Sequence, residues 1–102
     1  MGVENAVALI CKDKPGSLQL RVDTRPAHAA FLEGLIAEGK LAFAGPFLDA
    51  DGKPDGSLVM IEAPDMAAAQ ALAAADPYAK AGLFESVQIR PWNWVFQKPA
   101  GA

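Results

Sequence analysis

The chain has 102 residues, the length of one small domain. Hydrophobic residues make up 52% of it and charged residues 21%, which is enough apolar material for a core and leaves an excess that a partner would cover. The net charge of −3 argues against a nucleic-acid-binding surface and against binding to an anionic membrane, because both require clustered Lys and Arg.

The first half of the chain reads as a strand followed by a helix. Residues 6–11 form a nearly continuous apolar run, which is typical of a strand buried on both faces. A Pro-Gly pair then signals a turn. Thr24 suits a helix N-cap and Pro26 the first helical turn, so the first helix is predicted over 26–38. Gly39 is a suitable residue to end it.

The second half of the chain reads as a hairpin of two strands, a helix and a last strand. A polar turn rich in Asp and Gly separates the hairpin strands, and the following segment is Ala-rich, which favours a helix. This helix should stop at Asp76, because a residue that precedes a proline disfavours the helical conformation. These elements are expected over residues 41–48, 57–63, 66–75 and 84–96.

The order of elements is β-α-β-β-α-β, which is the ferredoxin-like arrangement. It predicts an α+β fold in which four strands form an antiparallel sheet and both helices cover one face. In the third strand Val59 and Ile61 point one way and Leu58 and Met60 the other, so one set can pack on the helices and the other set would face water in a monomer. Trp92, Trp94 and Phe96 would add aromatic surface at alternate positions of the last strand.

An apolar outer face of the sheet needs a cover. Burial stabilises by roughly 25 cal/mol per Å² of apolar area, so leaving this face in water would cost a small domain much of its stability. We therefore predict a homodimer in which two sheets pack face to face. The alternative is that the C-terminal segment folds back over its own sheet.

The chain contains one histidine, His28, near the start of the predicted first helix. In the predicted topology this helix start and the end of the second helix lie at the same end of the domain, so His28 should meet Asp76. A carboxylate that accepts an imidazole N–H fixes the tautomer and orientation of the ring, and the other ring nitrogen can then move a proton near neutral pH. The alternatives are that His28 is an ordinary surface or core-edge residue and that Asp76 only ends a helix.

Further residues are expected to bind a small substrate beside this pair. Gly and Pro at the bend of the second strand would let the backbone approach a ligand, and two hydroxyl groups would offer polar contacts. An arginine at the helix start would attract an anion, although an exposed helix-start charge is the alternative. The residues are Arg25, Gly45, Pro46, Ser57 and Tyr78.

The sequence favours neither a metal nor a cofactor. One histidine and one cysteine, Cys11, lie far apart in the chain and offer no recognisable metal cluster, and no glycine-rich phosphate-binding motif is present. Cys11 is expected to be an inert, small hydrophobic residue. Without a signal-peptide pattern or a long apolar run, a cytoplasmic location is expected. We expect one domain over residues 1–97 and a flexible tail over 98–102.

Several short strings occur in an order and spacing that cover nearly the whole chain and together resemble the YciI-like (YCII-related) family. They are Arg25-Pro26-Ala27-His28, Gly39-Lys40-Leu41, Ala44-Gly45-Pro46, Gly56-Ser57, Asp76-Pro77-Tyr78, Ala81-Gly82-Leu83-Phe84 and Arg90-Pro91-Trp92.

The resemblance implies a ferredoxin-like fold and a dimeric α+β barrel, and it places the His–Asp pair proposed as catalytic for the family on His28 and Asp76. Some relatives are similar in fold to muconolactone isomerases, and one branch is a dehydrochlorinase acting on a chlorinated hydroxyhydroquinone. The leading hypothesis is a small acid–base enzyme of lyase or isomerase type, in which His28 moves a proton and Asp76 holds the imidazole. The alternatives are a non-catalytic dimeric module that binds a small metabolite or a partner chain, and an accessory domain of a larger assembly.

Overall fold

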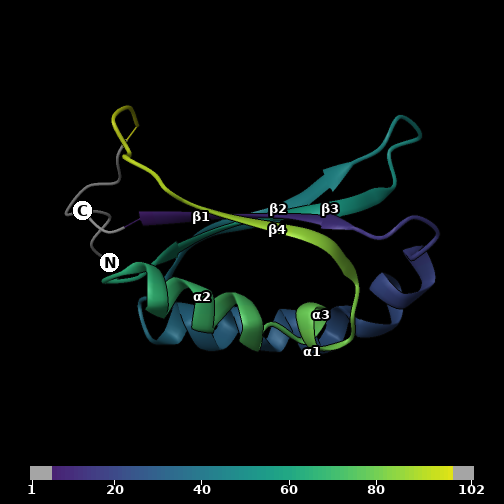
Figure 1. The fold of residues 1–102 in the computed structure, drawn as a ribbon, viewed down its shortest axis with the longest axis horizontal. Coiled ribbons are helices and arrows are strands. Elements are labelled where there is room, and N and C mark those ends of the chain that lie inside the picture. Colours follow the sequence, from purple (N-terminus) through teal and green to yellow (C-terminus); the bar gives the residue numbers. More distant parts are fainter. Residues whose placement is uncertain (1–5, 98–102) are drawn as a thin grey trace.

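The computed structural model describes residues 6–97 and shows one antiparallel sheet with the strand order β2-β3-β1-β4. The helices lie together on one face of this sheet (Figure 1). The predicted α+β arrangement is therefore confirmed, with one short helix, α3, in addition. The elements are β1 (Ala6–Asp13), α1 (Leu18–Ala37), β2 (Leu41–Leu48), β3 (Pro54–Glu62), α2 (Met66–Ala75), α3 (Pro77–Lys80) and β4 (Phe84–Pro91).

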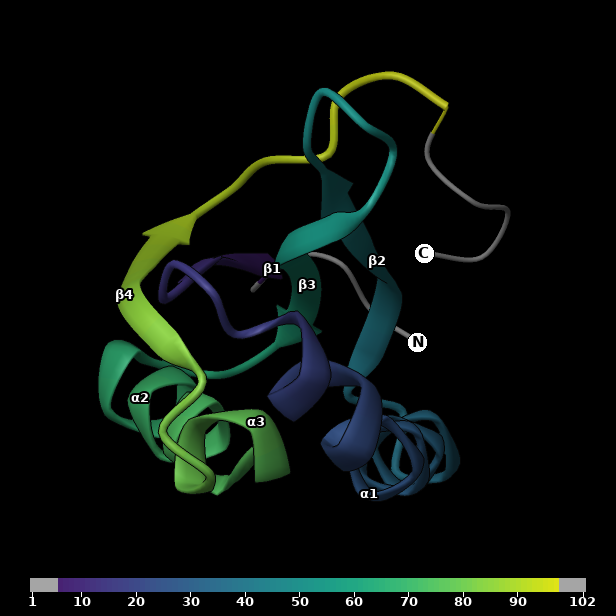
Figure 2. The same ribbon diagram turned by 90° about the vertical axis from the view of Figure 1, so that its right-hand side faces the viewer.

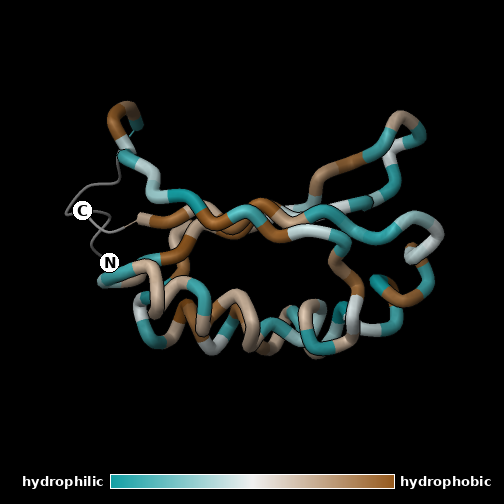
Figure 3. Tube along the Cα trace, in the orientation of Figure 1, coloured by the Kyte–Doolittle hydropathy of each residue, from teal (hydrophilic) through white to brown (hydrophobic). Residues whose placement is uncertain are grey.

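The main core lies between the sheet and the helices. Val7 and Leu9 of β1 and Val59 and Ile61 of β3 point toward the helices, and Leu35 of α1 packs against them. This alternation follows from the pleat of a strand, which sends successive side chains to opposite faces. Figure 3 shows hydrophobic and hydrophilic residues alternating along the helices below the sheet, as helices covering a core require.

Helix α1 begins at Leu18, so the prediction that it begins at Pro26 is wrong. Gly16, with a φ of 71°, turns the chain out of β1, and Ser17 stands at the N-cap. Pro26 lies inside the helix, where a proline removes one hydrogen bond and costs about 3 kcal/mol. The first turns of α1 rise from the line of the rest (Figure 1), as a proline kink allows.

The segment around Asp76 follows the prediction more closely. Helix α2 covers the predicted residues, and Asp65 caps it by accepting a hydrogen bond from the backbone N–H of Ala68 at 2.8 Å. Asp76 ends α2 as expected, and Pro77 then occupies the first position of α3, where its missing N–H is not needed. The short helix α3 was not predicted, because four residues give too little periodicity to detect.

The ends of three strands differ from the prediction. β1 runs to Asp13 rather than to Cys11. β3 begins at Pro54 rather than at 57, so the hairpin turn is shorter than expected. β4 ends at Pro91 rather than at 96, because proline lacks the N–H that a continuing ladder needs. The aromatic residues after it are therefore not strand residues, and the predicted alternation of Trp92, Trp94 and Phe96 is wrong.

The segment after β4 crosses the outer face of the sheet, the face opposite the helices. Figure 2 shows it leaving β4 and running above the sheet toward β2. Trp92 donates its backbone N–H to the carbonyl of Ala6 at 2.9 Å, and the Trp94 ring meets Phe43 of β2 edge-on at 5.3 Å between centroids. Part of the alternative, that this segment folds back over its own sheet, is thus observed. Phe96, at 83% exposure, remains open.

Among residues 6–97, no helix is both long and apolar enough to cross a membrane. The tail predicted over 98–102 lies outside the described residues.

Candidate active site

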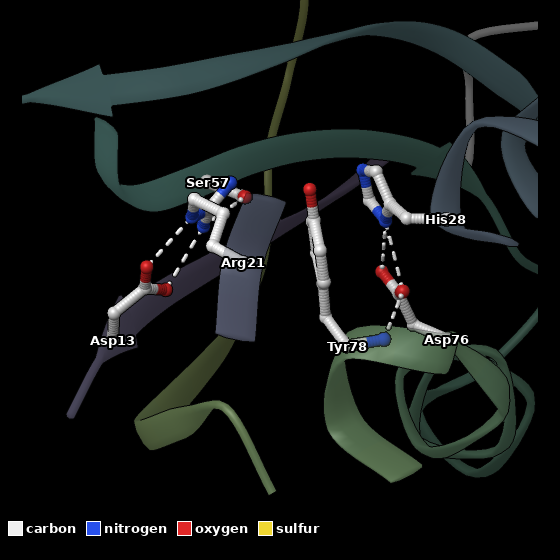
Figure 4. A network of polar contacts seen from close by, with 6 residues as sticks. All are labelled: Asp13, Arg21, His28, Ser57, Asp76 and Tyr78. Carbon is white, nitrogen blue, oxygen red and sulfur yellow. Dashed lines mark hydrogen bonds and ion pairs between the residues drawn. The ribbon is translucent and has the colours of Figure 1, made fainter. Parts of the chain in front are cut away.

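His28 and Asp76 meet through hydrogen bonds although they belong to different elements. Nδ1 of His28 lies 2.8 Å from Oδ1 and 3.0 Å from Oδ2 of Asp76. Because an ionised carboxylate only accepts hydrogen bonds, Nδ1 is the donor in this contact, and in a neutral imidazole Nε2 is then the nitrogen that keeps a lone pair. Figure 4 shows Nε2 pointing away from Asp76. The side chains are only 12% and 9% exposed, so water competes little with this contact.

The backbone around Asp76 holds its carboxylate in place. Asp76 is in an extended conformation between α2 and α3, and its Oδ1 also accepts the backbone N–H of Tyr78 at 2.9 Å. The same carboxylate therefore caps α3 and orients His28. Both interpretations of Asp76 from the sequence, helix punctuation and histidine partner, apply to the one side chain.

The ring of Tyr78 stacks on His28, with 4.0 Å between ring centroids and 20° between planes. On its other side lies Arg21, whose Cζ is 4.6 Å from the Tyr78 centroid (Figure 4). Burial raises the pKa of the Tyr78 hydroxyl, and the nearby charges of Arg21 and Arg25 oppose this only in part. Tyr78 therefore keeps its proton at neutral pH and can donate a hydrogen bond.

Arg21 forms a second buried pair, which sequence reasoning missed. Its Nε donates to Oδ2 of Asp13 at 2.6 Å, and its Nη2 donates to Oδ1 of Asp13 and to Oγ of Ser57, each at 2.9 Å. Burial alone would lower the pKa of Arg21, but the hydrogen bonds and charge of Asp13 outweigh it and the pKa is raised. The guanidinium is therefore always charged.

A signal for Arg21 did exist in the sequence. Arg21 and His28 are seven positions apart, which places them on the same side of a helix after nearly two turns. Starting the helix at Pro26 left Arg21 in a loop and hid this spacing. Asp13 was hidden because β1 was predicted to end at Cys11.

A cavity of about 260 Å³ lies where these elements meet. This is below the usual range of roughly 300–1,000 Å³ for ligand pockets, so the cavity suits a small molecule. His28 and all five residues predicted to bind substrate line it, whereas Asp76 contacts His28 from behind. The lining residues are Arg21, Arg25, His28, Ala29, Leu32, Ala44, Gly45, Pro46, Pro54, Ser57, Val59 and Tyr78.

The predicted ligand contacts differ in what they offer. The Ser57 hydroxyl is buried and accepts a hydrogen bond from Arg21, so it is partly engaged already. Gly45 and Pro46 are exposed on β2 and form a wall of the cavity. The tip of the hairpin lines a different cavity, together with Lys12 and Lys14.

Cys11 lies on the helix-facing side of β1 within the main core. Burial, helped by the nearby charge of Asp76, raises the pKa of its thiol to about 12, so it stays protonated. Within residues 6–97, no three His, Cys, Asp or Glu side chains gather as metal ligands would.

The fold and this site define a small α+β protein with a His–carboxylate pair at one end of its sheet. A family model described as the YCII-related domain matches residues 6–93. The chain therefore belongs to the YCII-related, or YciI-like, family. Protein YciI of Escherichia coli is 42% identical over 94 residues, covering 86% of this chain and 96% of that protein. An uncharacterized protein of Haemophilus influenzae is 34% identical with the same coverage.

Solved structures show the same fold. A 5-chloro-2-hydroxyhydroquinone dehydrochlorinase from Burkholderia phenoliruptrix, in complex with 2,5-dihydroxybenzoquinone, matches with a TM-score of 0.79 and 36% identity. That match covers 86% of this chain and 93% of the other. An antibiotic biosynthesis monooxygenase, at 17% identity and a TM-score of 0.54 over 88% and 97% of the two chains, shares the fold alone. The predicted fold class, of the dimeric α+β barrel type, is confirmed.

Proposed function

We propose that this protein is a cofactor-independent acid–base enzyme of lyase or isomerase type that acts on a small polar substrate. The observation that carries the proposal is the orientation of His28. Its Nδ1 is held by Asp76, while Nε2 points away from that carboxylate and the residue lines a small cavity. This is the arrangement that a general base needs, because the lone pair is available and the ring cannot turn away.

In the proposed reaction Nε2 takes a proton from the substrate and becomes an imidazolium that Asp76 stabilises. In an isomerase the proton returns to another atom of the substrate. In a lyase, the electrons of the broken bond form a double bond as the leaving group departs with its own electron pair. The dehydrochlorinase relative catalyses a reaction of the second type, so its substrate is the first compound to test.

The test uses 5-chloro-2-hydroxyhydroquinone and measures chloride release by the purified protein, together with exchange of solvent deuterium into a panel of enolisable ring compounds. We expect chloride release, or deuterium exchange in at least one compound, above the rate without protein. His28→Gln should lower that rate at least about 100-fold, which is the lower range for general base catalysis.

A matched control is Glu33→Gln, which changes an exposed residue of the same helix. It should keep the wild-type rate. If the rate of His28→Gln equals that of wild type, the proposal is wrong. If the protein binds ring compounds but turns over none of the panel, the non-catalytic binding module is the better description.

We further propose that two chains pair through the outer sheet face and that the protein is cytoplasmic. Support for the pairing comes from exposed aromatic residues beside Ala8 and Met60, which already form a second apolar cluster there. Trp92 is 40%, Phe43 37% and Phe47 43% exposed. Sedimentation at micromolar concentration should show a dimer, and a monomer would contradict the pairing.

A further inference from the structure

Two pairs, each formed by a basic side chain and a carboxylate, have the same orientation relative to the cavity. Arg21 and His28 line the cavity, whereas their partners Asp13 and Asp76 do not. Asp13 instead lines a separate cavity on the far side of the guanidinium. Arg25 is a further cation at the rim. Among the described residues that line this cavity, none is acidic, so a protein with a net charge of −3 presents a cationic interior here.

The guanidinium of Arg21 has hydrogen-bonding capacity left. Its bonds to Asp13 and Ser57 use Nε and Nη2 and leave Nη1, and a hydrogen bond with the Tyr78 side chain contributes to the raised pKa of Arg21. A guanidinium carries five N–H donors, and those of Nη1 are not bonded to the Asp13 carboxylate. The ring of Tyr78 separates Arg21 from His28 and its hydroxyl points the same way as Nε2 of His28 (Figure 4). Tyr78 therefore acts as a rigid spacer between a fixed charge and a proton acceptor.

We infer that Arg21, together with the hydroxyl of Tyr78, binds an ionised oxygen of the substrate, so that the site selects planar compounds carrying a phenolate or enolate oxygen. This inference rests on the proposed acid–base function and names the substrate class of the same site. An N–H donor with a full charge and a neutral O–H donor both stabilise an oxyanion, the more so in a site that excludes water. The oxyanion lies beside Arg21, and the proton that moves lies beside His28.

The chemistry follows from this placement. When His28 removes a proton from the conjugated system, negative charge spreads onto the phenolate or enolate oxygen. Arg21 would stabilise that charge on the oxygen. Because Arg21 stays charged at every working pH and is fixed by Asp13, its positive charge need not be created or reoriented during the reaction. A neutral ring of the same shape gains neither interaction.

The test uses 4-nitrophenol, whose absorbance distinguishes the phenol from the phenolate, and 4-nitroanisole, its O-methyl ether, which cannot ionise. The wild-type protein should bind the phenolate more tightly than the ether and shift the ionisation of bound 4-nitrophenol to lower pH. Arg21→Met should weaken phenolate binding by about tenfold or more, as expected for a hydrogen bond to a charged group, and abolish the shift. Binding of 4-nitroanisole should change less than about twofold.

Arg21→Met leaves Asp13 buried without a cation, so this variant can fail to fold. The double variant with Asp13→Asn and Arg21→Met removes both charges and keeps the volume; it should show the same loss of phenolate preference. Circular dichroism and thermal unfolding check that each variant is folded. If the role of Arg21 were purely structural, its substitution would weaken the binding of both probes equally and would leave the shift in the ionisation of bound 4-nitrophenol unchanged.

His28→Gln separates this inference from the proposed function. The variant should lose turnover and keep the preference for the phenolate, because the oxyanion lies at Arg21. If the Arg21 variants keep the preference, or if the wild type does not prefer the phenolate or binds neither probe, the inference is wrong whatever the turnover assay shows. If the preference follows Arg21 but no turnover is found, the inference about binding stands and the enzyme proposal fails.

Discussion

The two ends of the cavity are built from the same parts and differ in one respect. At each end a buried aspartate is hydrogen-bonded to a basic side chain that lines the cavity, Asp13 to Arg21 and Asp76 to His28. Arginine cannot lose its proton in a protein, whereas histidine exchanges one near neutral pH. One end therefore offers a permanent charge and the other a group that can take up a proton. The same type of residue therefore has two uses here: Asp13 fixes a permanent charge, and Asp76 orients a base.

The way each aspartate is held also differs. Asp13 ends strand β1 and binds Arg21 with both oxygens in a two-point contact. Asp76 sits between two helices, and both of its oxygens contact His28 while Oδ1 also accepts the backbone N–H of Tyr78. The Asp13 end is thus a buried ion pair whose contribution to stability depends on both partners. At the other end, Asp76 is also held by the backbone N–H of Tyr78.

The largest effect is expected on catalysis from Asp76→Asn. The amide of Asn can donate its own N–H to Nδ1 of His28, so the imidazole would carry its proton on Nε2 instead. A protonated Nε2 facing the cavity cannot act as a base. Turnover should fall about 100-fold or more with little change in KM. Nitrogen NMR of the imidazole should show the proton on Nδ1 in the wild type and on Nε2 in the variant. An unchanged tautomer with lost activity would contradict this explanation.

The next effect concerns stability and should be larger at the other end. Asp13→Asn leaves the buried charge of Arg21 without its partner and should lower the free energy of unfolding by about 3–5 kcal/mol. Asp76→Asn should cost less than about 2 kcal/mol, because its amide oxygen can still accept the N–H of Tyr78. Urea denaturation of both variants tests the order, and equal losses would show that the two ends are held alike.

The Cys11 thiol is influenced by the charges at both ends and should affect stability at alkaline pH. Burial raises the pKa of this thiol from an ordinary 9.0 to about 12 in the folded protein; the charge of Asp76 adds to this rise and that of Arg21 opposes it. Above pH 9 the unfolded chain loses this proton while the folded chain keeps it. The free energy of unfolding should therefore fall by up to ~1.4 kcal/mol per pH unit from pH 9 to 12, with no contribution below pH 9.

The control for that pH dependence is Cys11→Ala, which lacks the thiol. Denaturant unfolding between pH 7 and 11 should give a shallower alkaline decline for this variant than for the wild type. Parallel curves for the two proteins would show that the thiol does not carry the effect.

The smallest effect is expected from Tyr78→Phe, which keeps the ring between Arg21 and His28 and removes only the hydroxyl. Its stability should stay within about 1 kcal/mol of the wild type. Tyr78→Leu also removes the stacked ring and should cost about 0.5–1.5 kcal/mol more. Thermal unfolding of the pair measures this difference, and identical values would mean that the stack contributes nothing to stability.

Much of the fold followed from local patterns in the sequence. The alternation in β3, the Ala-rich α2 and the stop at Asp76 are set by residues close together in the chain, so periodicity and proline chemistry predict them. The order of these elements allowed one topology to be favoured, and that topology placed His28 and Asp76 at the same end. Their hydrogen bonds agree with this placement, while their catalytic role stays a prediction.

The errors arose where a local signal competed with a distant contact. Pro26 is typical of a helix start, yet α1 continues through it, and the turns before it hold the buried bonds of Arg21 to Asp13 and Ser57. Ser57 is far from Arg21 in the chain, so no local sequence pattern indicates the stabilisation that these hydrogen bonds provide. The end of β4 is a different case: the strand was predicted to run to 96 because aromatic residues alternate beyond Pro91, yet it ends at that proline.

The sequence by itself determined the α+β order of elements, the family and the end of the domain where the chemistry would lie, because these follow from short-range periodicity and from short motifs. Only the tertiary structure decided that the cavity has two ends. Asp13, Arg21 and Ser57 come from three elements, and their buried ion pair and hydrogen bonds exist only once β1, α1 and β3 are packed together. Folding makes that contact specific, because it removes both charges from water and places Asp13 and Ser57 where the Arg21 guanidinium can donate to them.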